Sequence, residues 1–449
     1  MSSPRERAHQ PSSFQLASFP PEILGEIFLA SIPVIGNRDN LPAYFPFTLT
    51  HVCRHWRASA LAFPKLWLFI DVEQTAENQE GDCPEHELME EYLERSGNHP
   101  LTIRLAHSFD RMHYTTYMET LYQYSDRWET VFFRHLCDYA FECLFPAEPS
   151  SYPMLRNLDC SLTYFDSDPS ARRTLGPIPW AQLKRYHEYA CYWSPNGDYQ
   201  WAVLKQLVNV VDLRMELSVP YTTSTVKMPQ LRFAYIYPDI DINRILDSFE
   251  FPRIEGLSLK LLPAHPSNLL LPTQFKRLKI LRLCGEVVIL NTSLLVILTE
   301  LTTLTDLAVQ IHGDYSLSAP SGIDALYLFK LLTPDHDAQS VLVPQLQALR
   351  LTGFNPRPGA VDALIAMLRR RFGGSNRVQF SRLRRFELWM RPLNWFDDHP
   401  QPPTQTRPPA LGAALETLQS LRVTEGWDIR VDEEWAGDFW KEEMTSEFL

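Results

Sequence analysis

The stretch Phe251-Pro252-Arg253-Ile254-Glu255-Gly256-Leu257-Ser258-Leu259 carries the spacing that decides the fold. From Ile254, an apolar residue is followed by two others, a second apolar residue, one other and a third apolar residue. The same spacing begins upstream at Leu231 and downstream at Leu278. Because its last three positions alternate, they predict a short strand with one face in the core. Repetition of the unit predicts strands stacked side by side.

The repeated spacing covers most of the chain. Units begin at Trp128, Leu155, Val210, Leu231, Ile254, Leu278, Leu304, Leu346, Leu383 and Leu418, with room for one more at Leu183. From Val210 to Leu304 the starts are 21, 23, 24 and 26 residues apart, which lies within the leucine-rich-repeat range of 20–29. The predicted fold class is therefore α/β, with a leucine-rich-repeat-like solenoid of short parallel strands over residues 126–431.

Helices or irregular turns are expected on the outer side of this solenoid. Apolar periodicity indicates three helices, at Asn291–Leu298, Asp324–Leu332 and Val361–Phe372. Regular repeats carry an Asn or Cys that hydrogen-bonds to neighbouring backbone. Cys284 could do so, but most units lack such a residue, so the repeats are degenerate. A generic α/β domain with coincidental spacing is the alternative interpretation.

The N-terminal region has a different character. Phe19-Pro20-Pro21-Glu22-Ile23-Leu24-Gly25-Glu26-Ile27-Phe28 predicts an amphipathic helix that opens with two prolines, which suit a first turn. A second helix is predicted from Leu49 to Ala60, after a loop between Pro33 and Pro46. Two short helices cannot bury two apolar faces alone. Either they cap a larger core, or part of their surface meets a partner.

This region resembles the F-box, a short helical motif. Beyond the first helix, the match continues through Leu49-x-x-Val52-Cys53-Arg54-x-Trp56-Arg57 and Pro64-x-Leu66-Trp67. Phe19 stands where the family usually has Leu. The long inter-helix loop, with Tyr92–Leu101 and Ser125–Trp128, is similar to the F-box families of mushroom-forming fungi.

The resemblance implies docking to a Skp-type adaptor and, through it, to a cullin-RING ubiquitin ligase. The adaptor-binding residues that it implies are Pro20, Pro21, Ile23, Leu24, Ile27, Phe28, Leu49, Val52, Cys53 and Trp56. The solenoid would then recruit an unknown protein substrate for ubiquitylation. The alternative is an F-box scaffold that acts outside ubiquitylation.

These patterns divide the chain into five parts. We expect residues 1–14 to be disordered, 15–70 to form the F-box-like helical domain, and 71–125 to form an acidic linker and a helix near Glu85–Ser96. The solenoid follows over 126–431, with a proline-rich loop at 391–410. Residues 432–449 mix acidic and aromatic side chains and are expected to form a cap or a docked tail.

Composition narrows the classes of partner and compartment. The net charge of −12 and the pI of about 5.6 disfavour a nucleic-acid binder. No apolar run approaches the roughly 20 residues of a membrane span, so no membrane partner is expected. The seven cysteines form no Cys-x-x-Cys pair, which indicates reduced thiols in the cytoplasm or nucleus.

A search for catalytic patterns favours a protein that is not an enzyme. His51 and His55 are four residues apart, but no further ligands accompany them, so no metal site is predicted. No Gly-x-Ser-x-Gly, phosphate-binding loop or dinucleotide fingerprint occurs, and no cofactor is expected. An enzyme with an unrecognised site remains the third hypothesis.

Two further groups are candidates for binding. The basic clusters Arg369–Arg371 and Arg382–Arg385 predict solvated helix ends or, alternatively, a site for an anionic partner. Aromatic residues in the strand rows could anchor a substrate on the concave side, although packing roles are as well supported. These candidates are Phe233, Tyr235, Tyr237, Trp389 and Trp395.

Overall fold

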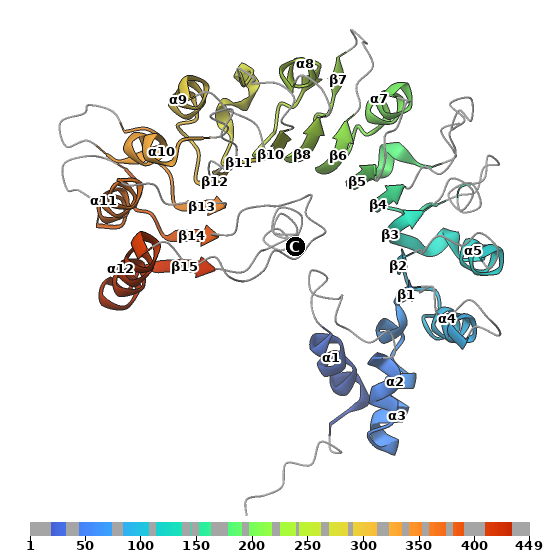
Figure 1. Cartoon of the computed structure of the whole chain (residues 1–449). Coiled ribbons are helices and arrows are strands. Elements are labelled where there is room, and N and C mark those ends of the chain that lie inside the picture. The colour runs from blue at the N-terminus through green and yellow to red at the C-terminus, as the bar shows by residue number, and fades with distance from the viewer. Residues whose placement is uncertain are drawn as a thin grey trace, which may run out of the picture.

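The computed structural model of the chain is an α/β fold built on one long parallel sheet (Figure 1). It describes residues 19–32, 45–73, 84–106, 114–136, 145, 152–162, 178–190, 197–217, 225–238, 242–261, 269–285, 291–311, 323–334, 341–352, 359–373, 380–389 and 409–432. The expectations for residues 1–14 and 433–449, and for most of the proline-rich loop 391–410, therefore lie outside the described residues.

The main sheet has 13 strands that follow one another in chain order, and every neighbouring pair is parallel. They are β1 (Phe69–Glu73), β2 (Leu101–Ala106), β3 (Trp128–Leu136), β4 (Asn157–Leu162), β5 (Arg185–Ala190), β6 (Asp212–Leu217), β8 (Phe233–Pro238), β10 (Gly256–Leu261), β11 (Ile280–Gly285), β12 (Asp306–Gln310), β13 (Ala348–Thr352), β14 (Arg385–Trp389) and β15 (Asp428–Asp432). A small second sheet pairs β7 (Val226–Lys227) with β9 (Phe249–Glu250). The order of the main sheet is that of a solenoid.

Helices lie outside the curve of strands, which forms an open horseshoe (Figure 1). The outer helices are α4 (Pro84–Arg95), α5 (Tyr114–Gln123), α7 (Gly197–Gln206), α8 (Ile242–Asp247), α9 (Asn291–Glu300), α10 (Ala325–Leu332), α11 (Ala360–Gly373) and α12 (Pro409–Glu425). Short 3-10 turns take the place of a helix at η6 (Trp180–Gln182) and η7 (Thr273–Arg277), whereas η5 (Ser125–Arg127) follows α5 directly. The three helices predicted from periodicity are confirmed as α9, α10 and α11.

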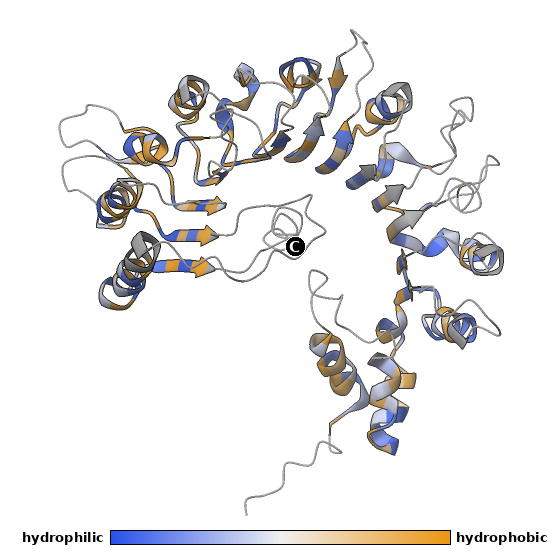
Figure 2. Ribbon diagram, viewed as in Figure 1, coloured by the Kyte–Doolittle hydropathy of each residue, from blue (hydrophilic) through white to orange (hydrophobic). Residues whose placement is uncertain are grey.

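The core lies between the strands and the outer elements. In β11, Leu281 and Leu283 are buried and stand in register with Leu257 and Leu259 of β10. Side chains alternate along each strand, so apolar residues face the core and mostly polar ones face the inner side of the horseshoe. Figure 2 shows this alternation as bands along β13, β14 and β15. The predicted strand units are thereby confirmed from β3 to β14.

The sheet begins earlier than the sequence pattern predicted. Residues 71–125, expected to be a linker and a helix, contain the end of β1, all of β2 and two outer helices. Trp67, Ile70 and Val72 repeat the unit spacing, and all three are buried. The first unit therefore starts at Trp67, inside the segment 15–70 that the sequence pattern predicts to be the helical domain.

The last predicted unit is wrong. Leu418, Leu421 and Val423 lie in the helix α12, where Leu418 and Leu421 are buried and Val423 is 82% exposed. Leu415, Leu418 and Leu421 recur every three residues, which suits one face of a helix better than a strand. The strand of this unit is β15, with Ile429 directed into the core.

The N-terminal unit consists of α1 (Pro21–Ser31), α2 (Phe45–Thr50), α3 (Arg54–Leu61) and the 3-10 turn η3 (Pro64–Trp67). The prediction of a single second helix from Leu49 to Ala60 is wrong, because helical structure stops after α2 and begins again at α3. Cys53 has extended backbone there, and its Sγ accepts the backbone N–H of Trp56 at 3.4 Å. It is thus the N-cap of α3.

The helices of the unit pack closely. A Cβ on Gly25 would lie 2.5 Å from the Phe63 ring, so only glycine fits where α1 meets the chain after α3. Phe28 and Trp56 join α1 to α3, with ring centroids 4.8 Å apart.

Trp67 joins the N-terminal unit to the start of the sheet. It is fully buried, and its Nε1 donates to the carbonyl of Ala60 at 2.9 Å. Its ring meets Phe47 of α2 and Tyr92 of α4 edge-on, at centroid distances of 5.1 and 5.0 Å. The guanidinium of Arg95 lies 4.5 Å from the same ring. Elements of the helical unit and of the first repeat therefore share one aromatic cluster.

Candidate protein-binding surfaces

The first candidate surface lies on the N-terminal unit and is made of exposed apolar residues. Ile23 and Ile27 are one turn apart on α1 and are 47% and 45% exposed. Val52, between α2 and α3, is 57% exposed, and Leu61 at the end of α3 is 39% exposed. We call these four residues the apolar docking face. Large apolar groups left in water on so small a unit are typical of a binding surface.

The ten predicted adaptor-binding residues divide into two sets. Leu24, Phe28 and Leu49 are buried and hold the helices together, and Trp56 is half-buried against Phe28. Pro20, Pro21, Ile23, Ile27, Val52 and Cys53 are exposed. The structure thus leaves six of them accessible to a partner, while the other four shape the surface from below.

Polar contacts fix the edges of this unit. His55 Nε2 lies 3.1 Å from the carbonyl oxygen of Phe19, and Arg57 Nε donates to the carbonyl of Thr50 at 2.8 Å. These bonds tie α3 to the residues before α1 and to the end of α2. His51 is exposed. Over the described residues, no cluster of three His, Cys, Asp or Glu side chains could hold a metal ion.

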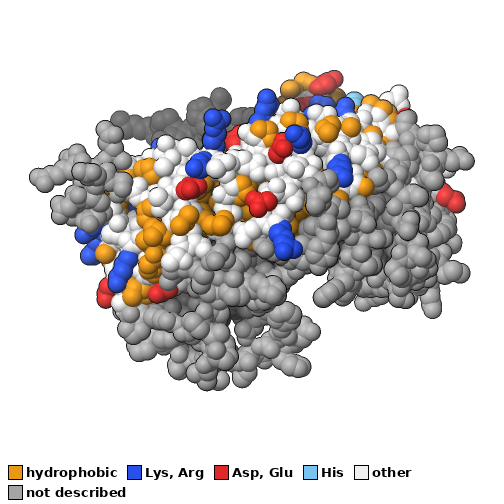
Figure 3. All heavy atoms as spheres, turned by 90° about the horizontal axis from the view of Figure 1, so that it is seen from above, with side chains coloured by type: hydrophobic (Ala, Val, Ile, Leu, Met, Phe, Trp, Pro, Cys, Tyr) orange, Lys and Arg blue, Asp and Glu red, His pale blue; other side chains and the backbone are white. Residues whose placement is uncertain are grey.

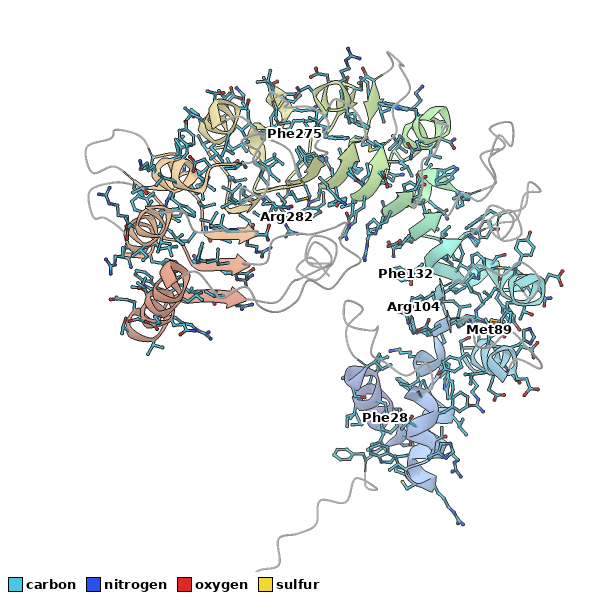
Figure 4. The ribbon with its side chains drawn as sticks, viewed as in Figure 1. Phe28, Met89, Arg104, Phe132, Phe275 and Arg282 are labelled. Carbon is cyan, nitrogen blue, oxygen red and sulfur yellow. The ribbon has the colours of Figure 1, made fainter. Side chains whose placement is uncertain are left out.

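The second candidate surface is the inner side of the horseshoe. Figure 4 shows Arg104, Phe132 and Arg282 on this side, and Met89 and Phe275 on the outer side. The middle inward position of successive strands forms a row, which we call the central row. From β1 to β15 it holds Asp71, Arg104, Phe132, Asp159, His187, Arg214, Tyr235, Ser258, Arg282, Ala308, Arg350, Glu387 and Arg430. It combines charged residues with aromatic and small ones.

Two of the five predicted aromatic anchors, Phe233 and Tyr235, are buried on this face. Phe233 and Tyr235 are 5% and 7% exposed, and Phe233 lies where a Cβ on Gly256 would stand 2.8 Å from its ring. Tyr237 is half-buried, with the Nζ of Lys260 4.3 Å from its ring centroid. Trp389 ends β14, but its side chain lies outside the described residues, as does all of Trp395. Phe233 and Tyr235 are therefore packing residues.

Charged groups in the central row pair across strands. Arg104 of β2 binds Asp71 of β1 through two hydrogen bonds, one of them from Nε at 2.8 Å. At the other end, Arg350 lies 3.5 Å from Asp306 and 3.3 Å from Glu387. Arg385 and Arg430 extend this network to Asp428 on β15. Apart from Arg385, sequence analysis missed these residues, although Arg104, Arg350 and Glu387 each stand between the two apolar positions of their strands.

His187 lies between two carboxylates on the same face. Its Nδ1 is 3.1 Å from Asp159 of β4, and its Nε2 is 3.4 Å from Asp212 of β6. Burial and the charge of Arg214 act to lower the pKa of His187, but the two carboxylates outweigh them, and the net pKa is raised. Burial acts to raise the pKa of Asp212, yet His187 and Arg214 outweigh it, and that pKa is lowered.

These shifts predict how stability depends on pH. The pKa of His187 is raised in the folded protein. Its contribution to the free energy of unfolding is therefore complete below the ordinary pKa of 6.5 and is lost as pH rises through the folded pKa. The pKa of Asp212 is lowered, so Asp212 stabilises the folded state above its ordinary pKa of 3.8. This stabilisation is lost as pH falls through the folded pKa. We expect His187→Gln to cost more unfolding free energy near pH 6 than near pH 9, measured by urea denaturation. An equal cost at both pH values would contradict the pairing.

The predicted basic cluster at Arg369–Arg371 has a structural role at its end. Arg371 is fully buried and donates to the carbonyls of Leu332, Val343 and Leu342 at 2.8, 3.2 and 2.8 Å. Burial lowers the pKa of its guanidinium to about 10. Arg370 donates to the carbonyl of Pro334 at 2.7 Å. Arg382 and Arg384, by contrast, are exposed.

The outer surface mixes Lys, Arg, Asp and Glu with scattered apolar side chains (Figure 3). A shallow hollow between η7 and α9 is lined by Leu270, Phe275, Val296 and Ile297. None of the helices in the described part of the chain is long and apolar enough to cross a membrane.

Comparison with known proteins adds no assignment: neither a scan against protein-family models nor a search of curated proteins found a match.

Proposed function

We propose that this protein is an F-box substrate receptor. Its N-terminal unit would dock a Skp-type adaptor of a cullin-RING ubiquitin ligase, and the leucine-rich-repeat-like solenoid would hold a protein substrate. The observation that carries the proposal is the apolar docking face: Ile23, Ile27 and Val52 are exposed within the F-box-like match. The match also supplies Leu24, Phe28 and Leu49, which are buried beneath them. In this role the protein works in the cytoplasm or nucleus.

The joint at Trp67 supports this role. A substrate receptor raises the effective concentration of substrate at a distant catalytic partner, and a fixed geometry between its two ends favours that effect. Trp67 contacts Phe47 of α2 in the N-terminal unit and Tyr92 of α4 beside the first strands. Substrate held on the solenoid would thus keep a defined position relative to the adaptor.

The proposal is tested by purification of the tagged full chain from fungal cells. We expect the Skp-type adaptor and a cullin to co-purify, and bound partner proteins to live longer when Ile23 and Ile27 are both replaced by Asp. Adaptor without cullin, and partners of unchanged lifetime, would favour the scaffold alternative. Absence of the adaptor would overturn both.

A further inference from the structure

One edge of the main sheet is basic, although the chain as a whole carries a net charge of −12. From β4 to β14, the residue directly before each strand of this sheet belongs to a continuous ladder, which follows Glu129 of β3. Each backbone N–H in it donates to the carbonyl of the residue before it in the ladder, at 2.7 to 2.9 Å. We call these nine residues the edge row. Only Glu255 among them is acidic, whereas five are basic: Arg156, Lys184, Arg232, Lys279 and Arg384.

A second row lies two residues earlier in each of the same turns. It adds three arginines, Arg253, Arg277 and Arg382, and contains no acidic residue. All three are exposed, and Arg253 Nη1 donates to Oε1 of Gln230 in the neighbouring turn at 2.8 Å. We call the eight basic residues of the two rows the basic edge. Its densest part lies where β8, β10 and β11 begin, and consists of Arg232, Arg253, Arg277 and Lys279.

Glu255 holds two of these cations in place. Arg232 Nε donates to Glu255 Oε1 at 2.6 Å, and Lys279 Nζ donates to Oε2 at 2.8 Å. The hydrogen bond from Arg232 lowers the pKa of Glu255, so this carboxylate stays charged. Both basic side chains nevertheless remain open to solvent, at 45% and 58% exposure. One carboxylate thus positions two cations and neutralises only part of their charge.

The other carboxylates near this part of the edge leave its positive charge uncompensated. Glu250 and Glu300 each pair with a lysine that lies outside the two rows. In the part of the chain that the structure describes, neither Arg253 nor Arg277 forms an ion pair with a carboxylate. Two exposed guanidinium groups therefore stand beside the pair that Glu255 positions. Guanidinium groups bind carboxylates through two parallel hydrogen bonds, so this arrangement favours a ligand with several carboxylates.

The spacing of the basic edge suits an extended peptide. Arg232 and Lys279 are two strand steps apart, and Arg384 follows three steps later, which makes roughly 24 Å in all at ~4.8 Å per step. An extended peptide with acidic residues at alternate positions presents carboxylates about 6.8 Å apart along one side. Between Lys279 and Arg384 the edge row holds only Thr305 and Gln347, whose side chains can bond to a peptide backbone. Nucleic acid fits less well, because its dense charge is repelled by a chain of net charge −12.

We propose that the basic edge binds an extended segment of a protein partner that is rich in Asp and Glu. Arg253 and Arg277 take its carboxylates directly, and Arg232 and Lys279 contribute from either side of Glu255. This names a class of substrate for the receptor proposed above, and to that extent it rests on the proposed function. The binding itself needs no adaptor and is measured without one.

The test uses the full chain and a fluorescein-labelled peptide of about twelve residues in which Glu and Ser alternate. Fluorescence anisotropy should show saturable binding that weakens between about 50 mM and about 500 mM salt. Arg253→Gln with Arg277→Gln should weaken it at least about tenfold, because two charge-assisted hydrogen-bonding groups are lost. The matched control, Arg54→Gln with Lys65→Gln, removes two exposed charges from the N-terminal unit. It should change binding by less than about twofold, because distant charges are screened.

A substitution of opposite sign sharpens the test. Glu255→Gln removes the carboxylate that competes with the peptide for Arg232 and Lys279, so binding should tighten at least about threefold. Glu416→Gln removes an exposed carboxylate from α12 and should leave binding unchanged. Weaker binding of the Glu255→Gln chain would contradict the role given to this carboxylate.

Three results would overturn the proposal. The first is the absence of saturable binding by the wild-type chain at up to about 1 mM peptide. The second is equal weakening by the two double variants, which would indicate general charge attraction. The third is tighter binding of an oligothymidylate than of the peptide, which would indicate a nucleic-acid site. Failure of adaptor docking with peptide binding intact would overturn the receptor and support the basic edge as a binding surface of its own.

Discussion

The chain with Ile23→Asp and Ile27→Asp is expected to bind a Skp-type adaptor at least about 100-fold more weakly than the wild type. Both side chains are about half exposed, at 47% and 45%, so a partner would complete their burial. Buried apolar anchors of this kind contribute about 2 kcal/mol each to binding, and a carboxylate in their place must also be desolvated. Isothermal titration calorimetry with purified adaptor measures the effect.

Folding should survive these two substitutions, since exposed positions usually change stability by only about 0.5 kcal/mol. Phe28 is a poorer probe, because it is 2% exposed and its loss would disturb the unit itself. The matched control is Val296→Asp with Val423→Asp, which places two carboxylates at exposed apolar positions on α9 and α12. The control should bind the adaptor like the wild type. Equal weakening in both double variants would indicate a general charge effect and not a docking face.

Trp67→Ala is expected to cost about 3–5 kcal/mol of unfolding free energy, as is typical for loss of a buried tryptophan. The ring fills the joint between Phe47 and Tyr92, and its N–H satisfies the carbonyl of Ala60. Because each repeat contacts only its neighbours, the damage should remain local. Hydrogen exchange should quicken in α1–α3, β1 and β2 and stay slow in β10–β13.

Trp427 offers the corresponding control at the opposite end. It is half-buried and stacks on Phe372 of α11, with centroids 4.7 Å apart. Trp427→Ala should quicken exchange in α11, α12 and β15, leaving the N-terminal unit unchanged. If the Trp67 variant lost protection from hydrogen exchange uniformly along the chain, this would contradict a solenoid in which each repeat is stabilised only by its neighbours.

The middle of the fold could be predicted from sequence because its signal is local. Leu257 and Leu259, or Leu281 and Leu283, each indicate a strand of six residues, and the next unit repeats the same spacing. The two ends could not be read in this way. Trp67 is both the last residue of the helical motif and the first position of a repeat. The sequence pattern therefore does not reveal β1. At the other end, Leu418 and Leu421 fit the repeat spacing, but the three-residue recurrence that includes Leu415 belongs to a helix.

The candidate surfaces were predictable in part. The N-terminal residues were recognised as a group, but sequence cannot separate Ile23, which is exposed, from Leu24, which is buried. That division depends on how α1 packs against α3. On the inner face, the sequence predicts Tyr235 as an anchor but the structure buries it, because strand alternation shows which face a residue takes but not how exposed that face is.

Direct binding of the purified full chain to a purified Skp-type adaptor tests the central claim. The account predicts a one-to-one complex with a Kd below about 1 µM, which corresponds to roughly −8 kcal/mol. It further predicts that the Ile23→Asp, Ile27→Asp chain shows no complex at this concentration, whereas the Val296→Asp, Val423→Asp control retains it. Absence of wild-type binding even at about 50 µM adaptor, in a chain whose folding is verified, would contradict the account.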